Sequence, residues 1–251
     1  MRILSVNCNK FGGMAPNGKG ALLFPDVVDR IVLLTKFTLE LEEDSLVVLH
    51  EVNSRDNGLE DFADRFDPGT YTVHLPTYLK ESGLHPYGCT LAVTRKEAGW
   101  TQLPSLAPPG SFDYANKSVV LRGGGCTVMG VHMPYDTGYW DLLIDAFRRN
   151  CSAPLVIIGD LNTCDEGTPR REKYRELLSC GAVDAWTARD GDPDRATYEN
   201  GKRLDYALLS PGAYRRLRTV RVIDCLRTGG ITDHSGLYVE LASEPVEAPS
   251  G

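Results

Sequence analysis

The sequence lacks the features that mark secreted, disulfide-rich or membrane-spanning proteins. Its seven cysteines are odd in number, scattered and without a Cys-x-x-Cys pair, which argues against a disulfide framework or a zinc site. It also has no apolar run as long as a signal peptide or a membrane span, and its first residues, Met1 to Asn7, already follow a strand pattern. We therefore expect a cytoplasmic protein with free thiols and no membrane span.

An excess of positive charge is missing as well. The formal net charge is -7, so the chain offers no broad positive surface for a polyanion, although a local positive groove is compatible with this charge. The only basic cluster consists of Arg215, Arg216, Arg218 and Arg221 and lies in a strand-like stretch. Such spacing is more typical of a solvated edge strand than of a nucleic-acid track.

Internal repeats and low-complexity segments are also absent, and what is present is an alternation of strand patterns and amphipathic helices. With 251 residues, 42% of them hydrophobic, the chain can bury one substantial core. We expect a single domain over residues 1–241, a long loop from Arg65 to Gly88 and a disordered tail over residues 242–251. Helices are expected at 24–41, 140–149 and 171–179, and strands at 3–6, 46–51, 90–94, 118–122, 127–133, 155–158, 204–209, 219–223 and 237–241.

Four short acidic motifs lie at the ends of these strand patterns. They are Glu51, Gly159-Asp160-Leu161-Asn162, Arg203-Leu204-Asp205-Tyr206 and Thr232-Asp233-His234. A charge at the end of a buried strand must emerge at the rim of the sheet, so we expect these carboxylates to share one site. Several carboxylates at one rim make an oxygen-rich pocket suited to a hard divalent cation.

Taken in order with Asn7 and His132, these motifs resemble the endonuclease/exonuclease/phosphatase superfamily, which has the DNase I-like fold. The resemblance covers residues 2 to 241 and rests on six motifs in the right order rather than on any one of them. It implies an α/β fold, a four-layer α/β sandwich in which two packed, mostly antiparallel sheets are flanked by helices. It also implies a metal-dependent phosphoester hydrolase.

The acidic and amide residue types support that chemistry. Glu51, with help from Asp233, can bind Mg²⁺ or Mn²⁺, which offsets phosphate charge. Asp160 is the best candidate to orient the attacking water and accept its proton. Asn7 and Asn162 offer neutral amide donors that can hold phosphoryl oxygens.

The histidines add a second set of expected roles. His234 has two ring nitrogens, so one can face the phosphate while the other pairs with a carboxylate such as Asp205. This pairing would favour the imidazolium form. His132 can contact the phosphate or protonate the leaving oxygen.

Four positions depart from the family pattern or have an ordinary structural alternative. Asn9, a third candidate metal ligand, stands where some family members have aspartate, which predicts a weaker second metal site and one catalytic metal. His50 and Thr232 replace glutamine and serine and keep the capacity for hydrogen bonding. Lys117 stands where family members often place a phosphate-binding side chain, with a solvated strand end as the alternative.

Ordinary structural explanations exist for single residues. Asp160 and Asn162 are typical turn residues, Asp205 beside Arg203 could form a surface ion pair, and His132 or His234 could simply end a strand. The ordered series favours the catalytic interpretation.

The motifs are compatible with several classes of phosphoester substrate. We slightly favour nucleic-acid phosphodiesters over a small phosphate ester, such as a nucleotide, a sugar phosphate or a lipid head group. A non-catalytic phosphate-binding module is a further alternative, and no protein partner is indicated. Aromatic residues in candidate loops could stack on bases or sugars, namely Tyr71, Tyr78, Tyr87, Tyr114, Tyr135, Tyr139 and Trp140.

Overall fold

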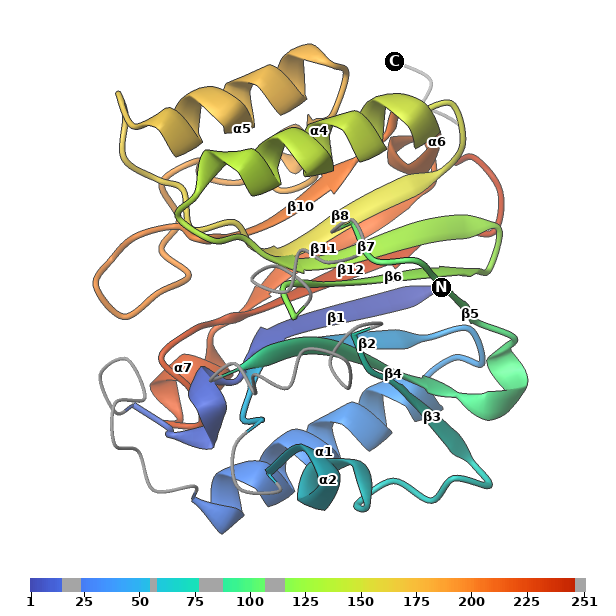
Figure 1. The fold of residues 1–251 in the computed structure, drawn as a ribbon. Coiled ribbons are helices and arrows are strands. Elements are labelled where there is room, and N and C mark those ends of the chain that lie inside the picture. The colour runs from blue at the N-terminus through green and yellow to red at the C-terminus, as the bar shows by residue number, and fades with distance from the viewer. Residues whose placement is uncertain (15–23, 55–57, 77–87, 107–115, 247–251) are drawn as a thin grey trace.

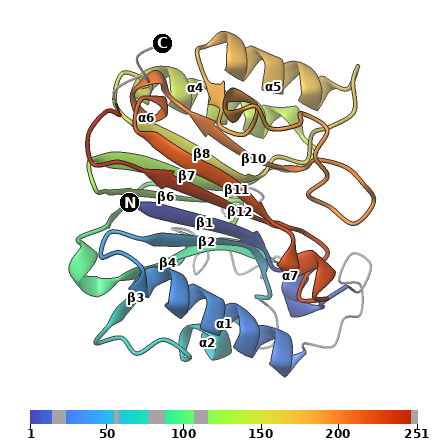
Figure 2. The same ribbon diagram turned by 180° about the vertical axis from the view of Figure 1, so that it is seen from behind.

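Two six-stranded sheets pack face to face and are covered on their outer faces by helices, giving four layers (Figures 1 and 2). The computed structural model describes residues 1–14, 24–54, 58–76, 88–106 and 116–246. The first sheet runs in the order β11 (Leu217–Ile223), β12 (Gly236–Leu241), β1 (Arg2–Asn7), β2 (Leu46–Val52), β4 (Cys89–Arg95) and β3 (Tyr71–His74). The second runs in the order β5 (Thr101–Leu103), β6 (Ser118–Gly123), β7 (Cys126–His132), β8 (Leu155–Asp160), β10 (Asp205–Leu209) and β9 (Val183–Asp184).

Each sheet contains one parallel pair of strands, and in each case a helix makes the crossover. Helix α1 (Pro25–Glu40) joins β1 to β2, and α4 (Thr137–Asn150) joins β7 to β8. The other strand pairs are antiparallel, as the family resemblance implies. Because parallel strands end at the same edge, each crossover brings two strand ends together.

Local sequence explains where the longer helices begin. Pro25 occupies the first turn of α1, where its missing N–H costs nothing. The carboxylate of Asp136 accepts from the Gly138 amide at the start of α4, and the Thr168 hydroxyl caps α5 (Pro169–Ser179) in the same way. The shorter helices are α2 (Gly58–Ala63), α6 (Pro211–Tyr214) and α7 (Cys225–Thr228), with 3₁₀ turns η1 (Asn9–Phe11), η3 (Lys96–Ala98) and η4 (Thr187–Arg189).

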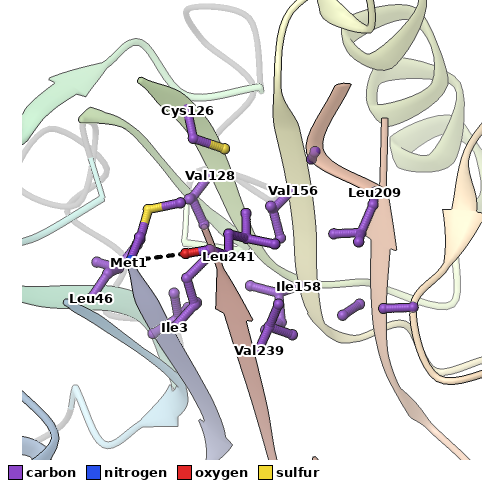
Figure 3. Close-up of a cluster of buried hydrophobic side chains, with 14 of the residues drawn as sticks. Met1, Ile3, Leu46, Cys126, Val128, Val156, Ile158, Leu209, Val239 and Leu241 are labelled. Carbon is purple, nitrogen blue, oxygen red and sulfur yellow. Dashed lines mark hydrogen bonds between the residues drawn. The ribbon is translucent and has the colours of Figure 1, made fainter. Parts of the chain in front are cut away.

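The core between the two sheets is made of interdigitating aliphatic side chains (Figure 3). Ile3 and Leu46 from the first sheet pack with Val156 and Ile158 from the second. The approach is closest at Gly130, where an added Cβ would lie 2.4 Å from Cγ1 of Val48. Two further clusters seal α1 and α2 against the first sheet, and α4 and α5 against the second. Strands in the middle of this arrangement are buried on both faces, which explains their continuous apolar runs.

The predicted helices and strands are all present, with ends shifted by a few residues. The prediction of one long loop from Arg65 to Gly88 was wrong at β3, which pairs there with β4, with Val73 opposite Val93. Four residues are too few to show a period, and the neighbouring strand determines their conformation. Residues 77–87 of that segment lie outside the described residues.

The expected disorder of the tail does not begin at residue 242. The amides of Ala242 and Val246 donate to the carbonyls of Arg216 and Arg215, while residues 247–251 lie outside the described part. All seven cysteines are free thiols. Within the described residues, none of the helices has the length and apolar character that crossing a bilayer requires.

Candidate active site

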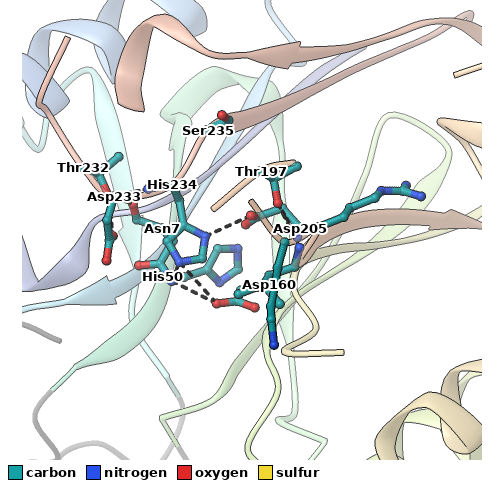
Figure 4. A network of polar contacts seen from close by, with 12 residues as sticks. Asn7, His50, Asp160, Thr197, Asp205, Thr232, Asp233, His234 and Ser235 are labelled. Atoms are coloured by element: carbon teal, nitrogen blue, oxygen red, sulfur yellow. Dashed lines mark hydrogen bonds and ion pairs between the residues drawn. The ribbon is translucent and has the colours of Figure 1, made fainter. Parts of the chain in front are cut away.

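The predicted site residues meet at one edge of the sandwich, where strands from both sheets end. Figure 4 shows five of them, namely Asn7, Asp160, Asp205, Asp233 and His234. Asn7 and Glu51 lie at the ends of the parallel pair β1 and β2, and His132 and Asp160 at the ends of β7 and β8. Asp205 begins β10, directly opposite Asp160. Asp233 and His234 immediately precede β12, which runs antiparallel to β1. The fold thus brings all six motifs together.

Asp160 is the most heavily bonded carboxylate of the site. Its Oδ2 accepts from Nδ2 of Asn7 at 3.1 Å, and its Oδ1 accepts from the amide of Asn162 at 2.8 Å. The residue is 2% exposed. Burial raises the pKa of Asp160 to about 7, although the nearby His234 opposes the rise. A carboxylate with that pKa can take up a proton near neutral pH.

His234 and Asp205 form a buried pair. Nδ1 of His234 lies 2.9 Å from Oδ2 of Asp205, and its Nε2 lies 3.8 Å from Oδ2 of Asp160. Burial alone would lower the pKa of His234, but Asp205 and Asp160 outweigh it and raise the pKa to about 10. The imidazole is therefore cationic at neutral pH, with its Nε2 directed toward the Asp160 carboxylate.

Glu51 lies between a histidine and a lysine. Its Oε1 lies 3.3 Å from Nδ2 of Asn7 and 3.5 Å from Nε2 of His132, while its Oε2 lies 2.8 Å from Nζ of Lys10. Burial would raise the pKa of Glu51, but His132 and Lys10 lower it to about 2. Burial also lowers the pKa of His132 to about 4. His132 is then neutral at pH 7, so the cation that holds Glu51 ionised is Lys10.

Three of these residues fit a divalent cation. Glu51, His132 and Asp160 each offer one ligand atom, and these atoms lie within 4.8 Å of one another. Carboxylate oxygens suit Mg²⁺ and Mn²⁺, and a neutral imidazole suits the first-row transition metals. This group differs from the predicted ligands, since it contains His132 and Asp160 in addition to Glu51.

The other two predicted ligands lie beside this group. Asp233 lines the same cavity, and Oδ1 of its carboxylate lies 3.3 Å from the Thr232 hydroxyl. Burial raises the pKa of Asp233 to about 6. Asn9 also lines the cavity, and its Nδ2 donates to the Gly13 carbonyl at 3.0 Å.

These groups line one open cavity of about 480 Å³. Two of the three predicted phosphate contacts, Lys117 and Asn162, line it, whereas the third, Asn7, is buried and is not among the lining residues. Lys117 is partly buried, and desolvation lowers the pKa of its ammonium. Asn162 has a left-handed backbone, and its Nδ2 donates to the Met133 carbonyl at 2.9 Å. The full lining is Asn9, Lys10, Glu51, Gly88, Asn116, Lys117, His132, Met133, Pro134, Tyr135, Asp160, Asn162, Tyr198, Leu204, Asp233 and His234.

Two residues that line the cavity, Lys10 and Tyr198, belong to no motif or strand pattern in the sequence. Lys10 reaches Glu51 only because the backbone turns sharply after β1. Tyr198 lies in a loop without periodicity, and its ring packs on His234 with centroids 4.7 Å apart. That contact depends on an isolated bridge between the two residues, which no local pattern reveals.

Of the aromatic residues predicted to stack on a substrate, one lies at the cavity and others are buried in the core. Tyr135 is 74% exposed, lines the cavity, and lies under the Arg170 guanidinium at 4.1 Å. Tyr139 and Trp140 are fully buried in the layer of α4, which excludes them from stacking on a substrate. Tyr71 packs on Phe66 beneath the first sheet. Tyr78, Tyr87 and Tyr114 lie outside the described residues.

Two of the remaining histidines are structural. His50 is fully buried between the hydroxyls of Ser5 and Thr90, and burial lowers its pKa well below the ordinary value. Its ring lies against Gly159, where any Cβ would also collide with the Val131 carbonyl. His74 bonds to Thr94, and burial lowers its pKa to about 4. Neither histidine is among the lining residues.

Comparison with known proteins gives one family and a set of similar folds. The family model described as the endonuclease/exonuclease/phosphatase family matches residues 33–234. No curated protein matches the sequence.

The similar solved structures cover nearly the whole chain. An AP endonuclease from Archaeoglobus fulgidus has a TM-score of 0.68 at 13% identity, over 96% of this chain and 99% of its own. The 3′ phosphatase NExo from Neisseria, bound to product DNA hairpin, has a TM-score of 0.65 at 18% identity, over 96% of this chain and 99% of its own. The endonuclease domain of the retrotransposon TRAS1 has a TM-score of 0.65 at 16% identity, over 97% of this chain and 98% of its own. At such identities the likeness establishes a shared fold, the DNase I-like sandwich.

Proposed function

The chain belongs to the endonuclease/exonuclease/phosphatase family, and from this membership we propose that it is a divalent-metal-dependent phosphoesterase that cleaves nucleic-acid phosphodiesters. The observation that carries the proposal is that Asp160, His234 and Glu51 line one cavity, with the buried Asn7 bonded to both carboxylates behind it. In this proposal water attacks phosphorus in line with the leaving oxygen. The single domain over residues 1–241 is the catalytic unit.

Asp160 is the proposed general base. It would orient the attacking water and accept its proton, and a pKa near 7 suits that task at neutral pH. Asn7 and the Asn162 amide bond to its two oxygens, which fixes the direction of the carboxylate. We assign to Asn7, Asn162 and Lys117 the additional task of holding phosphoryl oxygens.

His234 is the proposed electrostatic partner of the phosphate. Asp205 bonds to Nδ1, so the ring is oriented and held in its cationic form with Nε2 facing the cavity. A fixed positive donor at that position stabilises charge that develops on the pentacovalent phosphorus. Because His132 has a pKa near 4, we assign it a neutral contact to cation or phosphate rather than the role of leaving-group acid.

A divalent cation held by Glu51 beside His132 would neutralise phosphate charge and stabilise the leaving oxygen, while Asp160, the third member of that group, remains available as the base. Asp233 and Asn9 line the same cavity and are assigned to the same cation, which we propose to be Mg²⁺ or Mn²⁺.

Two observations support nucleic acid as the substrate. The similar structures include endonucleases and an enzyme bound to a DNA hairpin. The cavity rim also carries the exposed Tyr135 ring, on which a base could stack. A small phosphate monoester is the second candidate, because one similar structure is a 3′ phosphatase. The free cysteines lead us to propose a reducing compartment such as the cytoplasm.

The test is a substrate panel with purified protein. Plasmid DNA, single-stranded DNA, RNA, nucleotides and p-nitrophenyl phosphate are each incubated with Mg²⁺, Mn²⁺ or EDTA, alongside the Asp160→Asn variant. We expect metal-dependent cleavage of polynucleotides that EDTA and the substitution both abolish. Cleavage of monoesters alone would remove the nuclease assignment, and no turnover under any condition would leave a phosphate-binding module.

A further inference from the structure

A strained turn follows β1 directly beside the site. Asn9, Lys10 and Phe11 have φ angles of 42°, 55° and 63°, so three consecutive residues other than glycine adopt the left-handed region. Residues with a Cβ rarely enter this region, and each entry costs free energy. Glu51 and Asn162, both lining the cavity, have φ angles of 49° and 50°. Only Asp190 shares this conformation elsewhere among the described non-glycine residues. The strain is therefore concentrated at the site.

Contacts on both sides of Lys10 hold the turn in place. Before it, the Asn9 amide donates to Oδ1 of Asn7 at 3.0 Å, and the Asn9 side chain donates to the Gly13 carbonyl. After it, the Phe11 ring is fully buried and stacks on Phe62 with centroids 5.3 Å apart. The backbone thus aims the Lys10 side chain in a fixed direction.

That direction leads to Glu51. Nζ of Lys10 lies 2.8 Å from Oε2, with the lysine 19% and the glutamate 20% exposed. The other oxygen, Oε1, faces Asn7 and His132 within the group that fits a cation. One carboxylate therefore presents one oxygen to an ammonium and the other to the cation group.

We propose that Lys10 is a tethered cation that shares Glu51 with the metal ion, weakens metal binding, and turns to the substrate phosphate when the metal occupies Glu51. A divalent cation on Glu51 would repel an ammonium a few ångströms away. The flexible lysine stem allows the ammonium to move within the cavity, which Lys10 already lines. The phosphate half of this proposal rests on the proposed function, whereas the metal half concerns only Lys10 and Glu51.

Calorimetry without substrate tests the metal half. Mn²⁺ is titrated into EDTA-treated and dialysed full-length protein, and into Lys10→Met, Lys10→Gln and Lys10→Arg variants. We expect Lys10→Met and Lys10→Gln to bind Mn²⁺ at least about threefold more tightly, because Glu51 loses its competing ammonium. Lys10→Arg, which keeps the charge, should stay close to the unaltered protein. Circular dichroism confirms that each variant is folded, and Lys10→Gln replaces Lys10→Met if the latter is not.

Two matched variants calibrate this measurement. Lys96→Met removes an exposed lysine whose Nζ contacts the Pro68 carbonyl, so it makes the same change of charge far from Glu51. It should leave Mn²⁺ affinity unchanged, whereas Glu51→Gln should weaken it. Equal or weaker Mn²⁺ binding by Lys10→Met and Lys10→Gln would overturn the proposal, as would the absence of Mn²⁺ binding by the unaltered protein.

Inorganic phosphate tests the second half. At saturating Mn²⁺, the unaltered protein should bind phosphate roughly threefold to tenfold more tightly than Lys10→Met, because the displaced ammonium then contacts the anion. Equal phosphate affinity would overturn that half. If no phosphoester is hydrolysed at all, the proposed function fails, but the Mn²⁺ titrations still decide whether Lys10 competes for Glu51.

Discussion

At the residue scale, two neighbouring carboxylates are held in opposite protonation regimes. Burial dominates at Asp160 and raises its pKa to about 7, while Lys10 and His132 outweigh burial at Glu51 and lower its pKa to about 2. Both carboxylates bond to the same Asn7 amide nitrogen. When two neighbouring carboxyl groups have pKa values this far apart, one can stay ionised while the other exchanges a proton. Glu51 is a permanent anion suited to a cation, and Asp160 can exchange a proton.

The first prediction concerns Asp160. Asp160→Asn keeps the shape and the hydrogen bond to the Asn162 amide but removes the basic oxygen, so turnover should fall by about 10²–10⁴-fold. Single-turnover kinetics on the best substrate of the panel measure the chemical step, with circular dichroism as the check of folding. A variant within tenfold of the unaltered protein would refute the role of Asp160 as base.

The second prediction concerns His234 and pH. Its folded pKa of about 10 lies above the value of about 6.5 expected in the unfolded chain. The charged His234 therefore stabilises the fold fully below about pH 6.5, and this stabilisation is lost as pH rises through about 10. The stability advantage of the unaltered protein over His234→Gln should shrink by more than about 1 kcal/mol between pH 6 and pH 10.

Urea unfolding in EDTA at several pH values measures this advantage. Asp205, Asp160 and Asp233 all face the ring, so Asp205→Asn should remove much of the pH dependence. An advantage of His234 that stayed constant or grew toward pH 10 would contradict the assignment.

At the scale of elements, a buried polar network fixes the start of β10. Arg203 donates to Oδ1 of Asp184 on β9 at 2.8 Å, and the hydroxyl of Tyr174 on α5 donates to Oδ2 at 3.0 Å. The Arg203 guanidinium also lies over the Tyr206 ring at 4.3 Å. Arg203 lies two residues before Asp205, so this network anchors the strand that presents Asp205 to His234.

The third prediction follows from that burial. Arg203→Met should destabilise the fold by about 3–5 kcal/mol, because it leaves Asp184 buried without its cation. Arg175→Met on the exposed face of α5 loses only surface ion pairs and should cost less than about 1 kcal/mol. Urea denaturation of both variants gives the comparison. Similar small losses for both would show that Arg203 is not a structural anchor.

Elements buried on both faces could be predicted from sequence, because their apolar runs are continuous. The pattern was clear for β2 and β8, whereas the short β3, β5 and β9 take their conformation from longer neighbours. The same limit applies within the site. The strand-end pattern could single out as candidates the residues that end or begin long strands or lie next to one, namely Asn7, Glu51, His132, Asp160, Asp205 and His234. Lys10 joins the site through a left-handed turn, and Tyr198 joins it through an isolated bridge. Neither feature produces a periodic pattern of apolar residues, so neither residue could be predicted from the sequence.

At the scale of the whole molecule, the site depends on both sheets at once. The cluster between them contains Leu46 and Val48 from one sheet and Val156 and Ile158 from the other. If the two sheets separated, the inner face of each would be exposed to water. This would cost about 1.5–3 kcal/mol for each large aliphatic side chain that is now buried between them. We therefore expect one cooperative unit, as the single-domain prediction requires.

The fourth prediction is that unfolding has a single transition. Trp100 reports on the cluster between the sheets, and Trp140 reports on the layer of α4. Urea unfolding followed by circular dichroism and by tryptophan fluorescence should coincide in the unaltered protein and in Trp140→Phe. Separate midpoints would indicate that the two halves unfold independently.

The same order of strands surrounds the site in both sheets. In each, a parallel pair joined by a helix is followed by two antiparallel strands, β4 and β3 in one and β10 and β9 in the other. The two pairs nevertheless end differently, because Asn7 lies opposite His50 whereas His132 lies opposite Asp160. Asn7 and His132 each approach both Glu51 and Asp160, at 3.3, 3.1, 3.5 and 3.9 Å. Each sheet thus supplies one carboxylate and one uncharged partner for both carboxylates, so neither sheet alone holds a complete set of these contacts.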